Sequence, residues 1–461
     1  MDLPQDLTLF LALFVSCIIL FSSLKTFWSR GKLPPGPTPL PLLGNALKVG
    51  SDIANSLMKL SEKYGDVFTV YLGSRPVVVV TGYKLVREIY LDKGDEFLNR
   101  GDMPAFNYFY KDSGFVFNFN MKRWRDIRRF SLSALRDFGF GKRSSEDVIR
   151  EETNHVVEAF KNYKDLNTVD PRSSSRDKNM FVFSKVFELF PSLMSYIPGP
   201  HQKINKLLGK LSQYVDSRVK MNQKTLDPNN PRDYVDAFLI KIEKEKIKPD
   251  SEFNMKNLIA STLQIFFAAV ETMSTTTTYS LLVLMKYPDV LAKVHKEIDQ
   301  IIGRNREPTL QDRNHMPYTE AMVHEMQRFI DLIPMGLPRR TTKEVTLKGY
   351  TLPQGTQIYP MLTSVLKDPT CFKYPKEFNP ENFLNKKGEF KKNDAFMPLA
   401  LGKRICLGEA LVRMELFLFL VSILQNFDLK SPVPPEELDI TPNVSGLGNF
   451  PKPYKMAFIP R

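Results

Sequence analysis

Residues 253–286 form a stretch of 34 residues that contains neither proline nor glycine. Proline and glycine end or weaken helices, so this stretch predicts one continuous helix of about 50 Å at 1.5 Å per residue. Its middle, LIASTLQIFFAAV, is apolar, which predicts that the helix runs through a core. The 461 residues, 43% of them hydrophobic, are enough to bury such a helix in one large domain.

The rest of the chain is mostly helical by its apolar periodicity, with a few short strand signals. The predicted helices cover 144–164, 317–331 and 408–426, and the predicted strands cover 67–72, 75–80 and short segments within 345–360 and 451–460. The sequence therefore predicts a mainly α fold with a minor β region, in a single large domain over residues 46–461.

The amino terminus carries an uncharged run, Leu7 to Leu24, of 18 residues. That length just crosses ~30 Å of hydrocarbon as a helix. Three basic residues follow it within positions 25–32, which predicts that the remainder of the chain stays cytosolic. A cleaved signal peptide is the alternative, but it would show a basic start and a small-residue cleavage site. We expect residues 1–26 to be a transmembrane signal-anchor and 27–45, with its five prolines, to be a proline-rich strut.

Composition excludes several classes of protein. Three cysteines exclude a disulfide-stapled scaffold, and the five histidines show no HExxH or paired His/Cys spacing for zinc. The net charge of +13 suits anionic membranes, acidic partners or nucleic acid. The basic residues are scattered and no nucleic-acid module is visible, so we expect a membrane lipid contact and no nucleic acid partner.

The segment 396–420 holds the strongest chemical signal. Cys406 precedes a helix predicted to start near Gly408, where the helix dipole and free N–H groups stabilise a thiolate. Gly402 and Gly408 lack a Cβ, so the backbone there can approach a flat ligand, and Arg404 can donate to a carboxylate. This pattern fits an axial ligand to haem iron. A small buried apolar cysteine is the alternative, and Cys406 taken alone does not exclude it.

Further motifs lie in the same chain. The segment G-x-R-x-C-x-G at 402–408 resembles the haem-binding signature of cytochrome P450 enzymes. Glu325-x-x-Arg328 is similar to the family's helix ion pair. Glu271-Thr272, after Ala268-Ala269, is similar to its oxygen-activation motif. Trp124-x-x-x-Arg128 is similar to its propionate-binding helix. The resemblance is to a microsomal, family-2-like member and covers nearly all of 33–461 except about 165–180.

The resemblance implies a haem-thiolate monooxygenase with the cytochrome P450 fold, binding haem b through the thiolate of Cys406. Such an enzyme inserts one atom of O2 into a lipophilic small molecule, whether xenobiotic, fatty acid or steroid. The chain shows no flavin or nicotinamide fingerprint, so electrons are expected from NADPH through a separate flavoprotein reductase, with cytochrome b5 as a further candidate partner. The expected location is the endoplasmic reticulum membrane.

Residue roles follow from the same resemblance, position by position. Thr272, Glu271 and Ala268 are the expected catalytic group, active in oxygen activation and proton delivery. The expected haem contacts are Arg100, Trp124, Arg128, Arg339, Arg404, Gly402 and Gly408; the expected pocket residues are Phe106, Phe115, Phe267, Ile333 and Leu447. Basic residues that could dock an acidic reductase are Lys122, Arg123, Arg125, Arg136 and Lys403.

Five positions depart from the pattern of the family. Ala269 replaces a glycine and Phe267 replaces a smaller residue, which predicts a narrower pocket. Leu399 replaces a phenylalanine that shields the sulfur. Asn382 stands where the family usually has an arginine or a histidine, and Arg339 where it often has a histidine. The change at 382 predicts a weaker network around Glu325 and Arg328.

A gap in the match is larger than these substitutions. The polar run Val169 to Asn179 stands where the family carries another apolar core helix, which it cannot replace. Uncovering that much core is costly against a total stability of ~5–15 kcal/mol. A catalytically inactive, haem-free, membrane-anchored variant is therefore the second hypothesis. A nucleic-acid binder, suggested only by charge, is the third.

Overall fold

The computed structural model describes residues 33–50, 52–161, 187, 190–194, 196–199, 201–444 and 448–461, together with 9, 10, 13, 14, 16, 17 and 20. The interval from Val169 to Asn179 and the predicted pocket residue Leu447 lie outside these residues. The seven described positions within the predicted anchor are helical and exposed.

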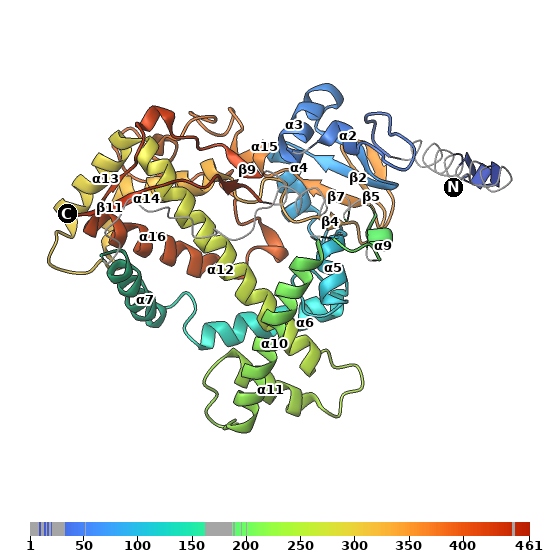
Figure 1. Ribbon diagram of the computed structural model, residues 1–461, viewed down its shortest axis with the longest axis horizontal. Helices are drawn as coiled ribbons and strands as arrows, with labels where there is room; N and C mark the ends of the chain where they lie inside the picture. Colours follow the sequence, from blue (N-terminus) through green and yellow to red (C-terminus); the bar gives the residue numbers. More distant parts are fainter. Residues whose placement is uncertain are drawn as a thin grey trace, which may run out of the picture.

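The helix α12 (Met255–Lys286) crosses the molecule diagonally and forms the axis of the helical body (Figure 1). It begins where Asn254 accepts a hydrogen bond from the backbone N–H of Asn257, and it ends before Tyr287-Pro288. Five helices pack against it, namely α10 (His201–Lys224), α11 (Tyr234–Glu245), α13 (Pro288–Ile301), α14 (Pro317–Ile330) and α16 (Glu409–Asn426). Among the described helices α12 alone is long and apolar enough to cross a membrane, but its packing is that of an internal helix.

Burial along α12 is uneven, which corrects the prediction that its apolar middle runs through the core. Leu258 and Leu263 near one end and Leu281–Met285 near the other are buried. Phe266 and Val270 between them are 48% and 51% exposed. These two side chains lie one turn apart on one helix face, and the described residues leave that face largely uncovered.

The other predicted helices are confirmed, with observed ends that differ by at most one residue; residues 162–164 of the first lie outside the described residues. They are α7 (Arg143–Lys161), α14 and α16. The remaining helical segments are α2 (Ala46–Val49), α3 (Ile53–Tyr64), α4 (Tyr83–Arg87), the π-helical turn η1 (Glu88–Asp92), α5 (Pro104–Tyr110), α6 (Met121–Asp137), α9 (Pro191–Met194), α15 (Thr363–Leu366) and the 3-10 turns η2 (Asp312–His315), η3 (Pro380–Phe383), η4 (Gly402–Arg404) and η5 (Pro435–Glu437).

The main sheet of the minor β region lies beside the helical body, whereas β11 (Ala457–Pro460) lies among the helices near the C-terminus (Figure 1). The main sheet has five strands in the order β1 (Val67–Leu72), β2 (Arg75–Val80), β7 (Gln357–Pro360), β4 (Arg339–Arg340) and β3 (Asn99–Arg100). Three two-stranded pairs complete the β region: β5 (Val345–Leu347) with β6 (Tyr350–Leu352), β8 (Phe427–Lys430) with β11, and β9 (Pro442–Val444) with β10 (Phe450–Pro451).

The register of β3 against β4 matters most for the site. These two short antiparallel strands set Arg100 directly opposite Arg339, and both side chains are buried. Like charges opposite each other destabilise a sheet, so this pairing needs a compensating negative charge.

Candidate haem site

Cys406 lies in a turn that leads into α16, as the sequence predicts. The 3-10 turn η4 precedes it, and its backbone N–H donates to the carbonyl of Leu399 at 3.0 Å. Gly408 is the N-cap of α16, and its backbone N–H acts on the Cys406 sulfur by lowering the pKa of the thiol. The sulfur therefore lies next to the start of a helix, on a turn whose backbone is fixed by the bond to Leu399.

The electrostatics of this sulfur are less favourable to a thiolate than predicted. Burial raises the pKa of the Cys406 thiol, while the Gly408 N–H and the charge of Arg128 lower it and Glu409 raises it further. Burial outweighs the helix start here. A thiolate at this position needs a cation on the sulfur itself, because a bound metal ion deprotonates a coordinating thiol. This agrees with an iron ligand.

Four of the predicted haem contacts are arginines, and the structure brings them together from four parts of the chain. Arg100 comes from β3, Arg128 from α6, Arg339 from β4 and Arg404 from η4. The guanidinium of Arg404 lies 4.0 Å from the Trp124 ring centroid, and Arg128 Nη2 donates to the carbonyl of Ile405 at 2.6 Å. Arg100 Nε donates to the carbonyl of Val116 at 3.0 Å.

The arginine cluster, meaning Arg100, Arg128, Arg339 and Arg404, carries an excess of positive charge. Burial and then the neighbouring arginines lower the pKa of Arg100 and of Arg404 well below the ordinary value. Within the described ranges no carboxylate forms an ion pair with any member of the cluster. Arg339 Nε and Arg404 Nη1 are buried without an acceptor.

Buried charges of one sign cost free energy unless an opposite charge compensates them. The arginine cluster therefore requires an anionic ligand next to Cys406. Haem carries two propionate carboxylates, and arginine binds carboxylate in a bidentate manner. The residues present fit haem at this site, with Cys406 for the iron and the arginine cluster for the propionates.

The two glycines of the cysteine turn have different roles. A Cβ on Gly408 would meet only the Cys406 sulfur, at 4.0 Å, so the backbone there leaves open space beside the sulfur, as predicted for a close ligand. Gly402 has φ +72°, and a Cβ there would lie 2.1 Å from the carbonyl oxygen of Tyr90. Gly402 is therefore required by packing against η1, and its expected contact with haem stays a prediction.

The oxygen-activation motif lies on the exposed middle of α12. Thr272 Oγ1 donates to the carbonyl of Ala268 at 2.7 Å, as the sequence predicts. The Glu271 carbonyl accepts from Thr275 Oγ1 at 2.6 Å, and its side chain is half-buried. These side-chain bonds to helix carbonyls bend or loosen a helix locally. Ala268 is exposed, so the helix has space beside it at this turn.

Of the predicted pocket residues, two lie together. The rings of Phe106 and Phe267 pack edge to face with centroids 6.5 Å apart, and Phe106 also stacks on Phe117 at 4.4 Å. Phe115 is 1% exposed within the core cluster that holds Trp124, and Ile333 is half-buried between α14 and β4.

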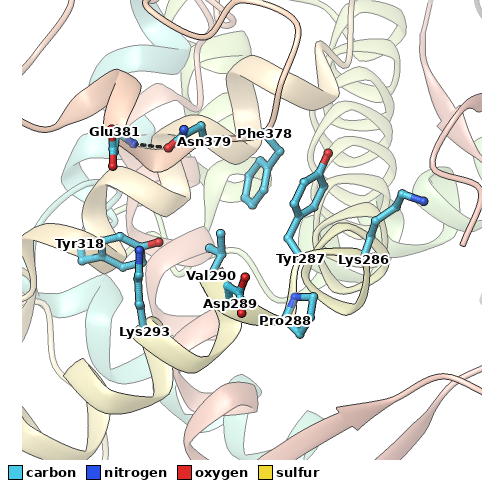
Figure 2. Close-up of a pocket in the computed structure, with 10 residues that line it drawn as sticks. All are labelled: Lys286, Tyr287, Pro288, Asp289, Val290, Lys293, Tyr318, Phe378, Asn379 and Glu381. Carbon is cyan, nitrogen blue, oxygen red and sulfur yellow. Dashed lines mark hydrogen bonds between the residues drawn. The ribbon is translucent and has the colours of Figure 1, made fainter. Parts of the chain in front are cut away.

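Surface clefts lie elsewhere. One of about 310 Å³, at the junction of α12 and α13, is lined by Lys286, Tyr287, Pro288, Asp289, Val290, Lys293, Tyr318, Phe378, Asn379 and Glu381 (Figure 2). A second, of about 590 Å³, lies between the outer side of α6 and residues 241–253. Neither cleft is lined by a residue of the cysteine turn. The described residues also hold no group of three or more metal-ligating side chains, whereas a haem needs one ligand from the protein.

The predicted ion pair is confirmed and is wholly buried. Arg328 Nε and Nη2 donate to the two carboxylate oxygens of Glu325 at 2.7 Å each, and both side chains are 0% exposed. Arg328 also donates to the carbonyls of Leu366, Tyr374, Pro375 and Glu377. Asn382 Nδ2 donates to both oxygens of Glu325, at 3.1 and 3.2 Å, so this residue joins the network that it was expected to weaken.

Sequence reasoning missed Tyr90. Its ring lies under the Arg339 guanidinium, 4.9 Å from centroid to Cζ, and its carbonyl abuts Gly402. The apolar run that contains it reads as ordinary helix interior, so no pattern in the sequence singles it out.

Comparison with known proteins identifies the family. A model of the family "Cytochrome P450" matches residues 34–177 and 174–458. Similar proteins include cytochrome P450 2A4 of Mus musculus, 46% identical over 483 residues and 97% of each chain, and cytochrome P450 2A13 of Homo sapiens, 45% identical over 482 residues and 97% of each chain. Cytochrome P450 2G1 of Oryctolagus cuniculus is 44% identical over 496 residues, covering 100% of each chain.

The same alignments support the predicted gap. The alignment with cytochrome P450 2G1 spans 496 positions, about 35 more than the 461 residues of this chain. The two family matches meet at 174–177, within the interval where the sequence predicts a missing segment. With nearly the whole chain matched and relatives similar over its full length, the chain belongs to the cytochrome P450 family and is a cytochrome P450 monooxygenase.

Proposed function

We propose that this chain oxidises a lipophilic small molecule with one atom of O2, using haem held by Cys406 and electrons from NADPH delivered by a separate flavoprotein reductase. The observation that carries the proposal is the arginine cluster beside Cys406, with buried donors that lack acceptors. Haem meets both needs of this site, because its propionates are negatively charged and its iron binds one soft ligand, the cysteine thiolate.

Each part of the site has a task that follows from its chemistry. The arginine cluster binds and orients the propionates, and the Trp124 ring backs the guanidinium of Arg404. Haem, when bound, supplies the oxygen-activating chemistry. The Thr272 hydroxyl donates to Ala268 and holds a proton at Oγ1 that can pass toward the cofactor face. Phe106 and Phe267 exclude water from an apolar substrate.

A carbon monoxide difference spectrum of the reduced protein tests the proposal. We expect a thiolate-type Soret band in the wild type and its loss in Cys406→Ala. Cys371→Ala is the matched control, because Cys371 is a free, half-buried cysteine remote from the arginine cluster in sequence. A folded wild-type protein without haem contradicts the proposal.

Docking of the reductase on basic side chains is the next part of the proposal. Arg125 and Arg136 on α6 are exposed. Arg123 contributes less, because its Nε donates to Glu252 at 2.6 Å. Lys403 is 60% exposed although it pairs with Asp95. We expect the KM for the reductase to rise with added salt, and a salt-independent KM argues against this surface.

Membrane attachment through residues 1–26 completes the proposal, with the catalytic domain on the cytosolic side of the endoplasmic reticulum. The 18-residue uncharged run and the basic residues after it support this. We expect deletion of residues 1–25 to reduce retention in the membrane fraction; unchanged retention argues for another attachment site.

A haem-free, inactive variant is the second candidate. Two observations favour it: the exposed Phe266 and Val270 of α12, and the roughly 35 positions present only in relatives. Both observations indicate that a segment which would cover α12 is missing from this chain. The same difference spectrum decides, because this variant folds without a Soret band.

A further inference from the structure

Tyr90 contacts two separate parts of the haem site, the cysteine turn at Gly402 and the segment that carries Arg339. It lies in the π-helical turn η1 and is 4% exposed. Its carbonyl abuts Gly402 in the cysteine turn, and its hydroxyl lies 3.0 Å from the point that a Cβ of Gly336 would occupy. Its ring supports the guanidinium of Arg339. Single π-helical turns often occur at functional sites.

The hydroxyl of Tyr90 has no acceptor for its proton among the described residues. It is buried, and it forms no hydrogen bond of ordinary geometry. The charged side chains that act on it are Arg339, whose guanidinium faces the hydroxyl oxygen as a donor, and Arg100; neither can accept the hydroxyl proton. Arg339 Nε is likewise buried without an acceptor. Two side chains in contact, Tyr90 and Arg339, therefore each keep a buried donor without an acceptor.

The hydroxyl is the protonated form. Burial raises the pKa of Tyr90 more than the two arginines lower it, so the side chain keeps its proton at neutral pH. A tyrosinate that neutralises the arginines internally is therefore not the solution here. A buried donor without a partner costs about 1–3 kcal/mol, so a native site is expected to supply an acceptor.

We infer that Tyr90 is a haem-binding residue of this chain, whose hydroxyl donates to the same propionate carboxylate that Arg100 and Arg339 bind. The inference rests on the proposed function, because haem is the anion in question. Tyr90 then links the propionate to the cysteine turn through its carbonyl contact with Gly402. A buried water on the hydroxyl is the competing solution, and it predicts no effect on haem.

Tyr90→Phe tests the inference because it removes the hydroxyl and keeps the ring under Arg339. The readout is the rate at which haem leaves the full-length holoprotein for excess apomyoglobin. We expect this rate to rise roughly tenfold, since a hydrogen bond to a charged group is lost. The propionate bending frequency in the resonance Raman spectrum should fall in parallel.

Two further variants separate the hydroxyl from other causes. Tyr90→Leu removes the ring as well and should release haem at least as fast as Tyr90→Phe. Tyr110→Phe is the matched control: its hydroxyl is also buried and unpartnered, but burial alone accounts for its raised pKa and no arginine acts on it. This control should release haem at the wild-type rate.

The outcomes are distinct. A wild-type rate and Raman spectrum for Tyr90→Phe overturn the inference and leave the proposed function intact. Equal acceleration by Tyr90→Phe and Tyr110→Phe also overturns it, because the effect is then one of general packing. If Tyr90→Phe does not fold, haem release from Tyr90→Leu decides, and a wild-type rate for that variant overturns the inference. Wild-type protein that takes up no haem overturns both proposals.

Discussion

Two buried arginine sites in this molecule behave in opposite ways. Arg328 is 0% exposed, and the two oxygens of Glu325 and four backbone carbonyls accept its hydrogen bonds. Three members of the arginine cluster, Arg100, Arg339 and Arg404, are nearly as buried, and Arg339 and Arg404 keep donors without acceptors. A buried charge that protein groups compensate can stabilise the folded chain, whereas a buried charge without a partner requires a ligand of opposite charge. Whether a buried arginine has a protein partner thus distinguishes an arginine that stabilises the fold from one that binds a ligand.

Glu325→Gln should give the largest effect, because it leaves the charge of Arg328 buried and uncompensated. We expect the free energy of unfolding to fall by about 3–5 kcal/mol. Urea unfolding measures it, with Asp92→Asn as the control, since Asp92 pairs with Arg87 on the surface at 3.0 Å. A loss below about 1 kcal/mol would remove the distinction between the two sites.

Acid should destabilise the compensated region through His324. Burial lowers the pKa of this side chain to about 4 from its ordinary 6.5; Glu320 opposes the shift, and Arg413 and Arg313 add to it. Because the unfolded chain binds the proton first, stability is full above pH 6.5 and falls as the pH drops toward 4, by up to about 3 kcal/mol. His324→Gln should flatten this slope in urea midpoints measured across pH 4–7; an unchanged slope assigns it to other groups.

Arg404→Met should affect the ligand more than the fold. In the haem-free protein, this substitution removes a hydrogen bond to Leu98 and the contact with Trp124. It also removes a positive charge that three neighbouring arginines repel. Because the two effects oppose each other, we expect the free energy of unfolding to change by less than about 1 kcal/mol. Haem release to apomyoglobin should accelerate about tenfold or more. Arg136→Met, at an exposed position on the same helix as Arg128, is the control. Strong destabilisation without faster release contradicts the comparison.

Asp95→Asn should give the smallest effect. Asp95 pairs with Lys403 next to the cluster, but the two side chains are 67% and 60% exposed. Exposed pairs contribute about 0–1 kcal/mol, so urea midpoint and haem release should stay near wild type. A clear change in haem release would extend the ligand site to this surface pair.

Much of the architecture follows from local sequence. The absence of proline and glycine, with Asn254 as cap, fixes α12, and short runs of β-branched and aromatic residues fix β1 and β2. The spacing of Glu325 and Arg328 puts both on one helix face, and the bond from Thr272 to Ala268 follows from helix geometry alone. Each of these interactions joins residues within one or two turns.

Contacts between distant segments could not be predicted in the same way. The role of Gly402 depends on the carbonyl of Tyr90, and the full network of Glu325 includes Asn382, 57 positions away. The exposure of Phe266 and Val270 depends on which elements lie beside α12, and the apolar pattern of the helix does not contain that information.

The sequence by itself determined the helical class, the family resemblance and the identity of Cys406 as the residue before a helix. Only the tertiary structure decided that Arg100 and Arg339 face each other across two short strands, that Arg404 stacks on Trp124, and that Tyr90 lies beneath Arg339. The physical reason is that periodicity and capping act over a few residues, whereas the balance of buried charge is set by segments up to about 300 residues apart that meet only when the chain is packed.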